Sequence, residues 1–146
     1  MNLSNNIRIN ISLTLTGTSG AARLKGKIGE TVATTLAGTD AVYSYSGNTA
    51  QSFDLADGTL DGPLGDAVTF DDVQLIYLYN KSETNTLTLG GGTDDITVLS
   101  GGLSVPAGGV AILIAGYAVG EGVDQITVSG TTTDGYDLIV IGTQPE

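Results

Sequence analysis

Two short stretches of the chain repeat one spacing of glycine, aspartate and apolar residues. Residues 92–98 and 122–128 both read Gly-x-Asp-x-Ile-Thr-Val, and each copy has a further glycine two positions earlier. This register is compatible with the calcium-binding repeats of a β-roll, which needs tandem nine-residue units so that neighbouring turns share each ion. Here Asp94 and Asp124 are 30 residues apart. The spacing therefore argues against a shared calcium site.

The alternative interpretation of the repeat is architectural. Gly92 and Gly122 turn the chain, and Asp94 and Asp124 cap the turns through their side chains. Two equivalent strands then begin, and their apolar side chains point into one core: Ile96 and Val98 in the first copy, Ile126 and Val128 in the second. We favour this second interpretation, which predicts two similar hairpins in a sandwich.

An acidic, glycine-rich loop is the other place where a cation could bind. Residues 55–67 carry Asp57, Asp61 and Asp66 among several glycines, and the adjacent pair Asp71 and Asp72 follows. Calcium takes six to eight oxygen ligands, and the spacing of an EF-hand loop with its closing glutamate is absent. We expect a solvated loop and no metal or cofactor, with these residues as the first calcium candidates.

The composition offers little for catalysis. The chain contains no histidine and no cysteine, which removes the commonest general base and the thiol nucleophile. The adjacent acid pairs 71–72 and 94–95 would point to opposite faces of a strand, whereas a glycosidase needs two carboxylates that converge. We predict a protein without catalytic residues, and not an enzyme.

Four tyrosines form two same-face pairs if their segments are strands. Tyr43 and Tyr45 form one pair, and Tyr77 and Tyr79 form the other. Such pairs can stack on sugars, as in carbohydrate-binding modules, but tyrosine is also enriched in cores and at protein interfaces. We treat all four as candidate interface aromatics.

Charge is distributed unevenly along the chain. Arg8, Arg23, Lys25 and Lys27 precede the first acidic residue, whereas from Gly29 onward sixteen acidic residues face only one lysine. An acidic body disfavours nucleic acid as a partner. We predict a basic arm over residues 1–28 that docks on an acidic protein surface, followed by one body domain over residues 29–146.

Alternation with period two dominates the chain and predicts strands. Apolar and polar residues alternate from Ile7 to Leu15, and further short segments follow with glycine-rich turns between them, about ten in all. Both faces are apolar in 73–80, which predicts a central strand buried on both sides. The apolar run 110–119 is too short to span a bilayer as a helix and is interpreted as a buried strand that follows the turn 105–109.

These patterns define the fold class. We expect an all-β protein: a single antiparallel β-sandwich, jelly-roll-like, with about ten short strands. No signal peptide is recognisable, since the first apolar stretch alternates with polar residues. We expect no membrane contact.

The order of motifs from about Asp72 to the end of the chain is familiar. "LIYLYNKSETNTLTLGGG" reads as strand, turn and strand, "LSVPAGGVAILI" as a turn that opens a buried strand, and "DQITVSGTTTDGYDLIVIG" as a closing hairpin. This order resembles small β-sandwich virion proteins of tailed bacteriophages, the capsid cement or decoration proteins and their head-associated relatives. The resemblance covers roughly half of the chain and supplies no functional residues by position.

The resemblance implies a protein made in the host cytoplasm that sits on the outer capsid surface of the virion. Such proteins are commonly trimers, carry no cofactor and clamp neighbouring major capsid protein subunits. A homo-oligomer is therefore expected, with the strand around Ile7–Leu15 available for pairing with a neighbouring copy or with the capsid. The alternatives are another virion component, such as a head spike, fibre base or tail tube, and a carbohydrate-binding or adhesin module.

Overall fold

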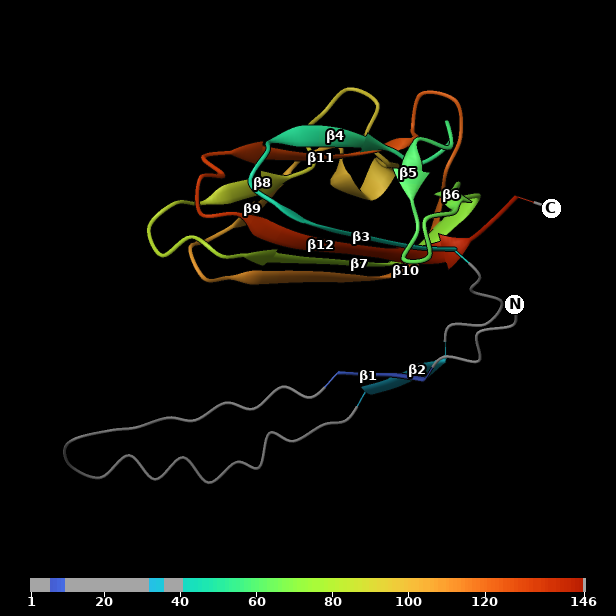
Figure 1. Cartoon of the computed structure of the whole chain (residues 1–146), viewed down its shortest axis with the longest axis horizontal. Coiled ribbons are helices and arrows are strands. Elements are labelled where there is room, and N and C mark those ends of the chain that lie inside the picture. Colours follow the sequence, from blue (N-terminus) through green and yellow to red (C-terminus); the bar gives the residue numbers. More distant parts are fainter. Residues whose placement is uncertain (1–5, 10–31, 36–40, 146) are drawn as a thin grey trace. The chain divides into compact units, whose positions relative to one another are not determined.

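The computed structural model describes residues 6–9, 32–35 and 41–145, and twelve strands lie within them (Figure 1). One four-stranded sheet has the order β10-β7-β12-β3. Its strands are β3 (Ala41–Gly47), β7 (Asp72–Asn80), β10 (Val110–Ala118) and β12 (Tyr136–Thr143). The prediction of an all-β protein with antiparallel strands is confirmed.

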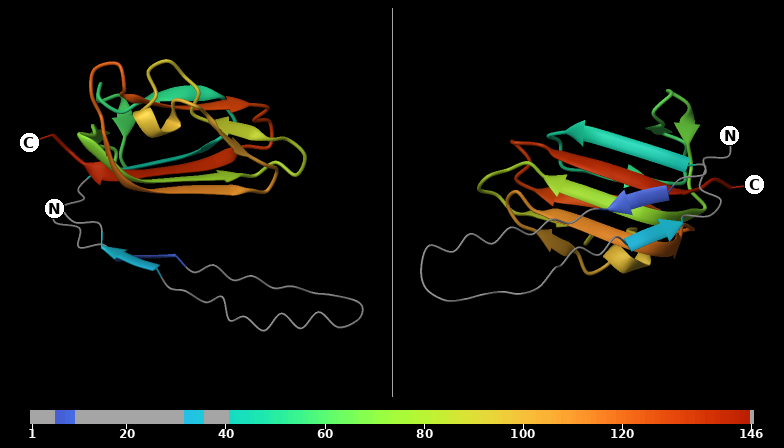
Figure 2. Two further views of the ribbon diagram at one scale, coloured as in Figure 1. Left: turned by 180° about the vertical axis from the view of Figure 1, so that it is seen from behind. Right: turned by 90° about the horizontal axis from the view of Figure 1, so that it is seen from below.

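A second four-stranded sheet has the order β4-β11-β8-β9. Its strands are β4 (Gln51–Asp54), β8 (Leu87–Leu89), β9 (Leu103–Val105) and β11 (Gln125–Gly130). A short ribbon pairs β5 (Leu60–Asp61) with β6 (Ala67–Val68), and a single 3-10 turn, η1, covers Thr97–Leu99. The two large sheets face each other as layers (Figure 2), and the jelly-roll connectivity stays a prediction.

The N-terminal part forms a separate unit. Strand β1 (Asn6–Ile9) pairs antiparallel with β2 (Val32–Thr35), so that Arg8 lies opposite Ala33. Residues 4–37 and the body from Gly38 onward divide into two compact units. The predicted strand from Ile7 to Leu15 is present in its first part, and its remainder lies outside the described residues.

The core lies between the two large sheets and follows from the alternation of side chains along each strand. In β12, Tyr136, Leu138 and Val140 are fully buried, while the residues between them are half-buried. The second sheet contributes the inward side chains of Phe53, Leu87, Leu89, Ile126 and Val128. Period-two patterning therefore decides which side chains enter the core.

Three predictions about individual strands are wrong. The run that begins at Val110 forms an edge strand with exposed side chains, and not a buried strand. Strand β7 is central in its sheet, but Tyr77 and Tyr79 on its outer side are only half-buried. Strands β11 and β12 belong to opposite sheets, so the chain does not close with a hairpin. Pairing partners distant in the sequence decide these positions.

The turn predicted between residues 105 and 109 is confirmed and links the two sheets. Gly109 donates a backbone hydrogen bond to the carbonyl of Pro106 over 2.9 Å, and Gly108 has a φ of 64°. A positive φ costs glycine little, because it has no Cβ. The turn carries the chain from β9 in one sheet to β10 in the other.

Candidate protein-docking face

The outer face of the β10-β7-β12-β3 sheet is unusually apolar. The antiparallel registers align its outward side chains in three rows across the four strands. In the order β10, β7, β12 and β3, the rows are Val110, Tyr79, Asp137 and Ser46; Ile112, Tyr77, Ile139 and Ser44; and Ile114, Leu75, Ile141 and Val42. Nine of these twelve positions are aliphatic or tyrosine, and we call those nine side chains the apolar face.

The apolar face is most open at its β10 edge. Val110 is 49% exposed, Ile112 36% and Ile114 38%. Toward the middle of the sheet most side chains are half-buried and Leu75 is only 5% exposed, because their cross-strand neighbours cover them. Fully burying an exposed aliphatic side chain contributes about 1.5–3 kcal/mol, and covering these partly exposed side chains contributes a share of that. A partner that covered this face would therefore gain a substantial apolar contact.

The opposite outer surface shows what a solvent-facing sheet in this chain looks like. The outward positions of the β4-β11-β8-β9 sheet are mostly hydroxyl side chains: Ser52, Thr88, Ser104, Thr127 and Ser129. We call these five residues the hydroxyl face. Antiparallel sheets commonly carry polar residues on the side that faces water. The hydroxyl face follows this rule, and the apolar face does not.

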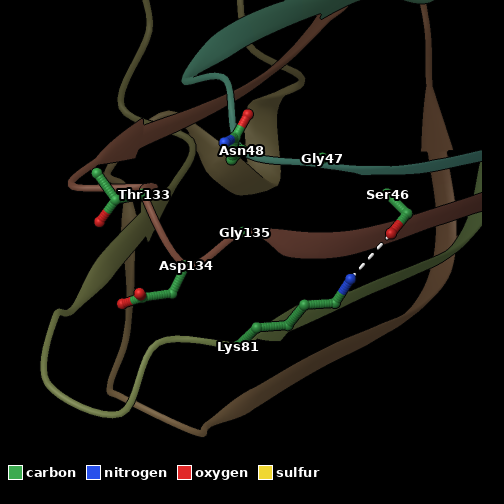
Figure 3. Close-up of a pocket in the computed structure, with 7 residues that line it drawn as sticks. All are labelled: Ser46, Gly47, Asn48, Lys81, Thr133, Asp134 and Gly135. Atoms are coloured by element: carbon green, nitrogen blue, oxygen red, sulfur yellow. Dashed lines mark hydrogen bonds between the residues drawn. The ribbon is translucent and has the colours of Figure 1, made fainter.

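A polar margin closes one end of the apolar face. Lys81 Nζ donates to Ser46 Oγ over 2.9 Å (Figure 3). It also forms an ion pair with Asp137 at 2.5 Å. Burial raises the pKa of Asp137, but hydrogen bonds from Lys81 and Ser46 outweigh it, so the net pKa lies below its usual range. Asp137 is the one carboxylate among the twelve outward positions of the three rows, and Lys81 therefore neutralises its charge.

A shallow depression of about 230 Å³ lies beside this margin. Its lining residues are Ser46, Gly47, Asn48, Lys81, Thr133, Asp134 and Gly135 (Figure 3). Asp134 accepts a hydrogen bond from Ser82 Oγ over 2.6 Å. The depression is a polar surface with donors and acceptors, adjoining the row that contains Tyr79.

The four predicted interface tyrosines separate into two groups. Tyr77 and Tyr79 belong to the apolar face, and their role at an interface stays a prediction. Tyr43 is 8% exposed, and its ring centroid lies 5.7 Å from that of Phe53 inside the sandwich. Tyr45 packs 5.1 Å from the same ring. Tyr43 and Tyr45 are therefore core aromatics, a correction to their proposed role at an interface.

The structure describes one of the four basic candidates. Arg8 is in β1, and Arg23, Lys25 and Lys27 lie outside the described residues. The proposed docking role of these four residues stays a prediction.

The calcium candidates are not assembled into a site. Asp57 Oδ1 accepts hydrogen bonds from the backbone N–H and the hydroxyl of Thr59, over 2.8 and 2.6 Å, and these bonds lower the pKa of Asp57. Asp61 and Asp66 are exposed. In the described part of the chain, no three carboxylates gather where a metal ion could be held. Asp57 instead fixes its own turn, as aspartate commonly does.

The two copies of the repeated phrase lie side by side but fold differently. The carbonyl of Asp94 accepts backbone hydrogen bonds from Asp124 and Gln125, each 2.9 Å long. Ile96 and Ile126 are both fully buried, as predicted. The second copy forms β11, whereas Thr97–Leu99 forms η1 and leaves Val98 40% exposed. The prediction of two equivalent strands is therefore wrong.

The capping role also falls to a different aspartate. Asp95, and not Asp94, accepts a hydrogen bond from the backbone N–H of Gly92, over 2.6 Å. Asp95 is 2% exposed, and its Oδ1 has no hydrogen-bond partner among the described residues. The sequence carries Asp at both positions, so the pattern alone did not indicate which one turns inward.

The sequence pattern missed the aliphatic members of the apolar face. The missed residues are Val42, Leu75, Val110, Ile112, Ile114, Ile139 and Ile141. A signal was available in the runs 110–114 and 138–141, where apolar residues continue without alternation. Such runs predict burial on both sides. In a sandwich of two layers, an apolar outer side indicates a binding surface.

Comparison of the chain with protein-family models, with curated proteins and with solved structures gives no match. Within the described residues, no helix has the length and apolar character required to cross a membrane.

Proposed function

We propose that this protein is a non-enzymatic assembly protein that binds another protein through the apolar face. The single observation behind the proposal is the alignment of nine apolar side chains on the outer side of one sheet. Contiguous exposed apolar surface of this kind, with a polar margin, is typical of protein interaction sites. Tyr77 and Tyr79 add a residue type that is enriched among the residues that anchor such contacts.

The partner that the sequence favours is the major capsid protein of a tailed bacteriophage, contacted on the outer surface of the head. The support is the resemblance of residues 72–146 to capsid decoration proteins. A sheet face is broad and shallow, and it suits contact with a wide surface better than insertion into a pocket. Many copies on one shell would bind with avidity, so each contact needs only modest affinity.

Co-sedimentation with expanded, undecorated phage heads tests this proposal. Tyr77→Ser with Ile139→Ser removes two central members of the apolar face, and Thr88→Ala with Thr127→Ala on the hydroxyl face is the matched control. We expect the first variant to lose at least about 10-fold in apparent affinity, equivalent to about 1.4 kcal/mol. The control should bind like the wild type.

Two outcomes contradict the proposal in different ways. Equal binding of both variants would show that the apolar face is not the contact surface. Failure of the wild type to bind any expanded head, at concentrations at which it is folded, would remove the capsid as partner.

A second candidate is carbohydrate binding, and the position of Tyr79 favours it. Tyr79 shares a row with Asp137 and Ser46, next to the polar depression that contains Lys81 and Asp134. An aromatic ring beside donors and acceptors is a common arrangement for sugar recognition. A glycan array would support this function if a specific hit disappeared in Tyr79→Ala but survived in Tyr117→Ala.

A further inference from the structure

Among the strands that the structure describes, β10 has one unpaired edge. It pairs with β7 alone, at the end of the order β10-β7-β12-β3. At the other end of that sheet, the β5–β6 ribbon approaches β3, and a Cβ on Gly62 would lie 3.5 Å from the carbonyl oxygen of Val42. No described strand covers β10 in this way. Its outward N–H and C=O groups are available for another strand.

The first part of β10, Val110–Ile114, has none of the devices that protect edges. Val110–Ala118 contains no charged residue and no proline. Natural edge strands are usually blunted by lysine, proline, short length or a bulge, because an open apolar edge pairs with other chains. The register shifts between Ile114 and Tyr117. The regular part of the edge is therefore Val110–Ile114.

We propose that β10 pairs antiparallel with β10 of a second copy of this chain. The regular segment Val110–Ile114 has its midpoint at Ile112, so a two-fold axis there uses its full length. Ile112 then lies opposite Ile112 of the second copy, and Val110 lies opposite Ile114 of that copy. A contact of this kind is self-complementary and closes as a dimer.

Charge favours this edge as the meeting point of two copies. The body is strongly acidic, with fifteen acidic residues and one lysine from Gly38 onward, so two bodies repel each other. Strand β10 carries no acid. In the rows that reach it, the one acid is Asp137, two strands away and paired with Lys81. Asp72 pairs with Ala118, beyond the shift in register.

The pairing would join two apolar faces into one. Two four-stranded sheets would become a continuous eight-stranded sheet, whose three rows of outward side chains would run across all eight strands and face the same way. A partner surface would meet twice the apolar area, and the second contact would form at high effective concentration. This inference does not depend on which protein is the partner.

Cysteine cross-linking tests the edge and its register, because the chain has no native cysteine. Directly opposite residues in an antiparallel pair have Cα atoms about 4.5–5.5 Å apart, which is within disulfide reach. We expect Ile112→Cys to form a disulfide-linked dimer under mild oxidation of the full-length chain. Ser44→Cys, in the same row on the opposite edge strand, is the matched control and should stay unlinked.

Sedimentation equilibrium supplies a second measurement that does not require cysteine. Ile112→Lys places two like charges opposite each other and should raise the dissociation constant of the dimer at least about 10-fold. Ser44→Lys should leave it unchanged. Circular dichroism checks that both variants are folded.

Three results would overturn the inference. They are a monomer at all concentrations, a trimer as the resemblance to decoration proteins implies, and a cross-link in Ser44→Cys without one in Ile112→Cys. The capsid-binding test uses residues of β7 and β12, so failure of the dimer and failure of the docking face are read separately.

Discussion

Ile112 on β10 lies directly opposite Tyr77 on β7, and both side chains stand on the outer surface of their sheet. Ile76, the next residue on β7, points inward and is fully buried. Two neighbouring apolar residues of the same strand therefore have different roles. Ile76 builds the core, and Tyr77 with Ile112 belongs to a surface that is open to a partner.

This relationship predicts that substitutions on the apolar face change the hydrophobicity of the surface much more than they change the free energy of unfolding. Tyr77→Thr with Ile112→Thr should lower the free energy of unfolding by only about 0.2–1 kcal/mol, the contribution of a cross-strand pair. The same variant should elute earlier from a hydrophobic-interaction column. Ile76→Ala should instead cost about 2–5 kcal/mol, because it leaves a cavity in the core. Similar losses in urea unfolding for both variants would contradict this division.

A buried asparagine is expected to hold two loops together. Asn80 is fully buried, and its Nδ2 donates to the carbonyls of Asn85, Val105 and Pro106 over 2.8–3.1 Å. Asn80→Ala leaves buried groups unpaired and should lower the free energy of unfolding by about 2–4 kcal/mol in urea titration. The exposed Asn48 is the control, and Asn48→Ala should change stability by less than about 0.5 kcal/mol. Equal effects of the two substitutions would show that the network contributes nothing.

Alkaline pH should destabilise the fold through Tyr136. The ring is fully buried, its hydroxyl donates to the carbonyl of Thr49 over 2.8 Å, and burial raises its pKa. Because the pKa is higher in the folded state, the stabilisation is complete below the unfolded value of about 10 and is lost as pH rises above it. Melting temperatures measured from pH 8 to pH 11 should therefore fall steeply at the upper end.

Tyr136→Phe should make that dependence shallower. It should also cost about 1 kcal/mol at neutral pH, because one hydrogen bond is lost. Burial raises the pKa of Tyr43 as well, so part of the alkaline loss should persist. Tyr79→Phe on the outer surface is the control. An unchanged slope in Tyr136→Phe would refute the assignment.

A strand glycine is expected to be irreplaceable. Gly142 lies where β12 shifts register against β7, and a Cβ there would overlap the carbonyl oxygen of Asp72 and lie 2.9 Å from the ring of Phe70. Gly142→Ala should destabilise the protein by about 3 kcal/mol, since both neighbours belong to the packed structure. A Cβ on Gly101 would meet no atom within 4 Å, and Gly101→Ala should be nearly neutral by thermal unfolding. If Gly142→Ala left the free energy of unfolding unchanged, β12 would have to move away from Asp72 and Phe70 at little cost, and the prediction would be wrong.

The strands could be read from the sequence because alternation is a local signal. Tyr136, Leu138 and Val140 point inward in β12 at the spacing that the sequence predicts. Local sequence failed where the partner decides the structure. The tripeptide Ile-Thr-Val lies in β11 from Ile126, whereas from Ile96 it leads into η1. Identical residues fold differently because only the second copy has strands on both sides.

The candidate docking surface was harder to predict than the fold. An apolar residue on both sides of a strand indicates burial on both sides, and the sequence does not state how many layers the protein has. Tyr77 and Tyr79 were singled out because tyrosine is a familiar interface residue. The aliphatic Ile112 and Ile139 could be assigned to the candidate docking surface only from the registers of β10 and β12, which place them in one row with Tyr77.

The contrast between the two outer surfaces has a consequence for how the protein could coat a large object. A molecule that adheres by its Ile- and Tyr-rich side turns Ser52, Thr88 and Thr127 toward the solvent. The surface that then faces the solvent is the polar hydroxyl face, which offers no apolar area for a further copy to bind. Deposition would therefore stop after a monolayer, and the coated particle would stay dispersed.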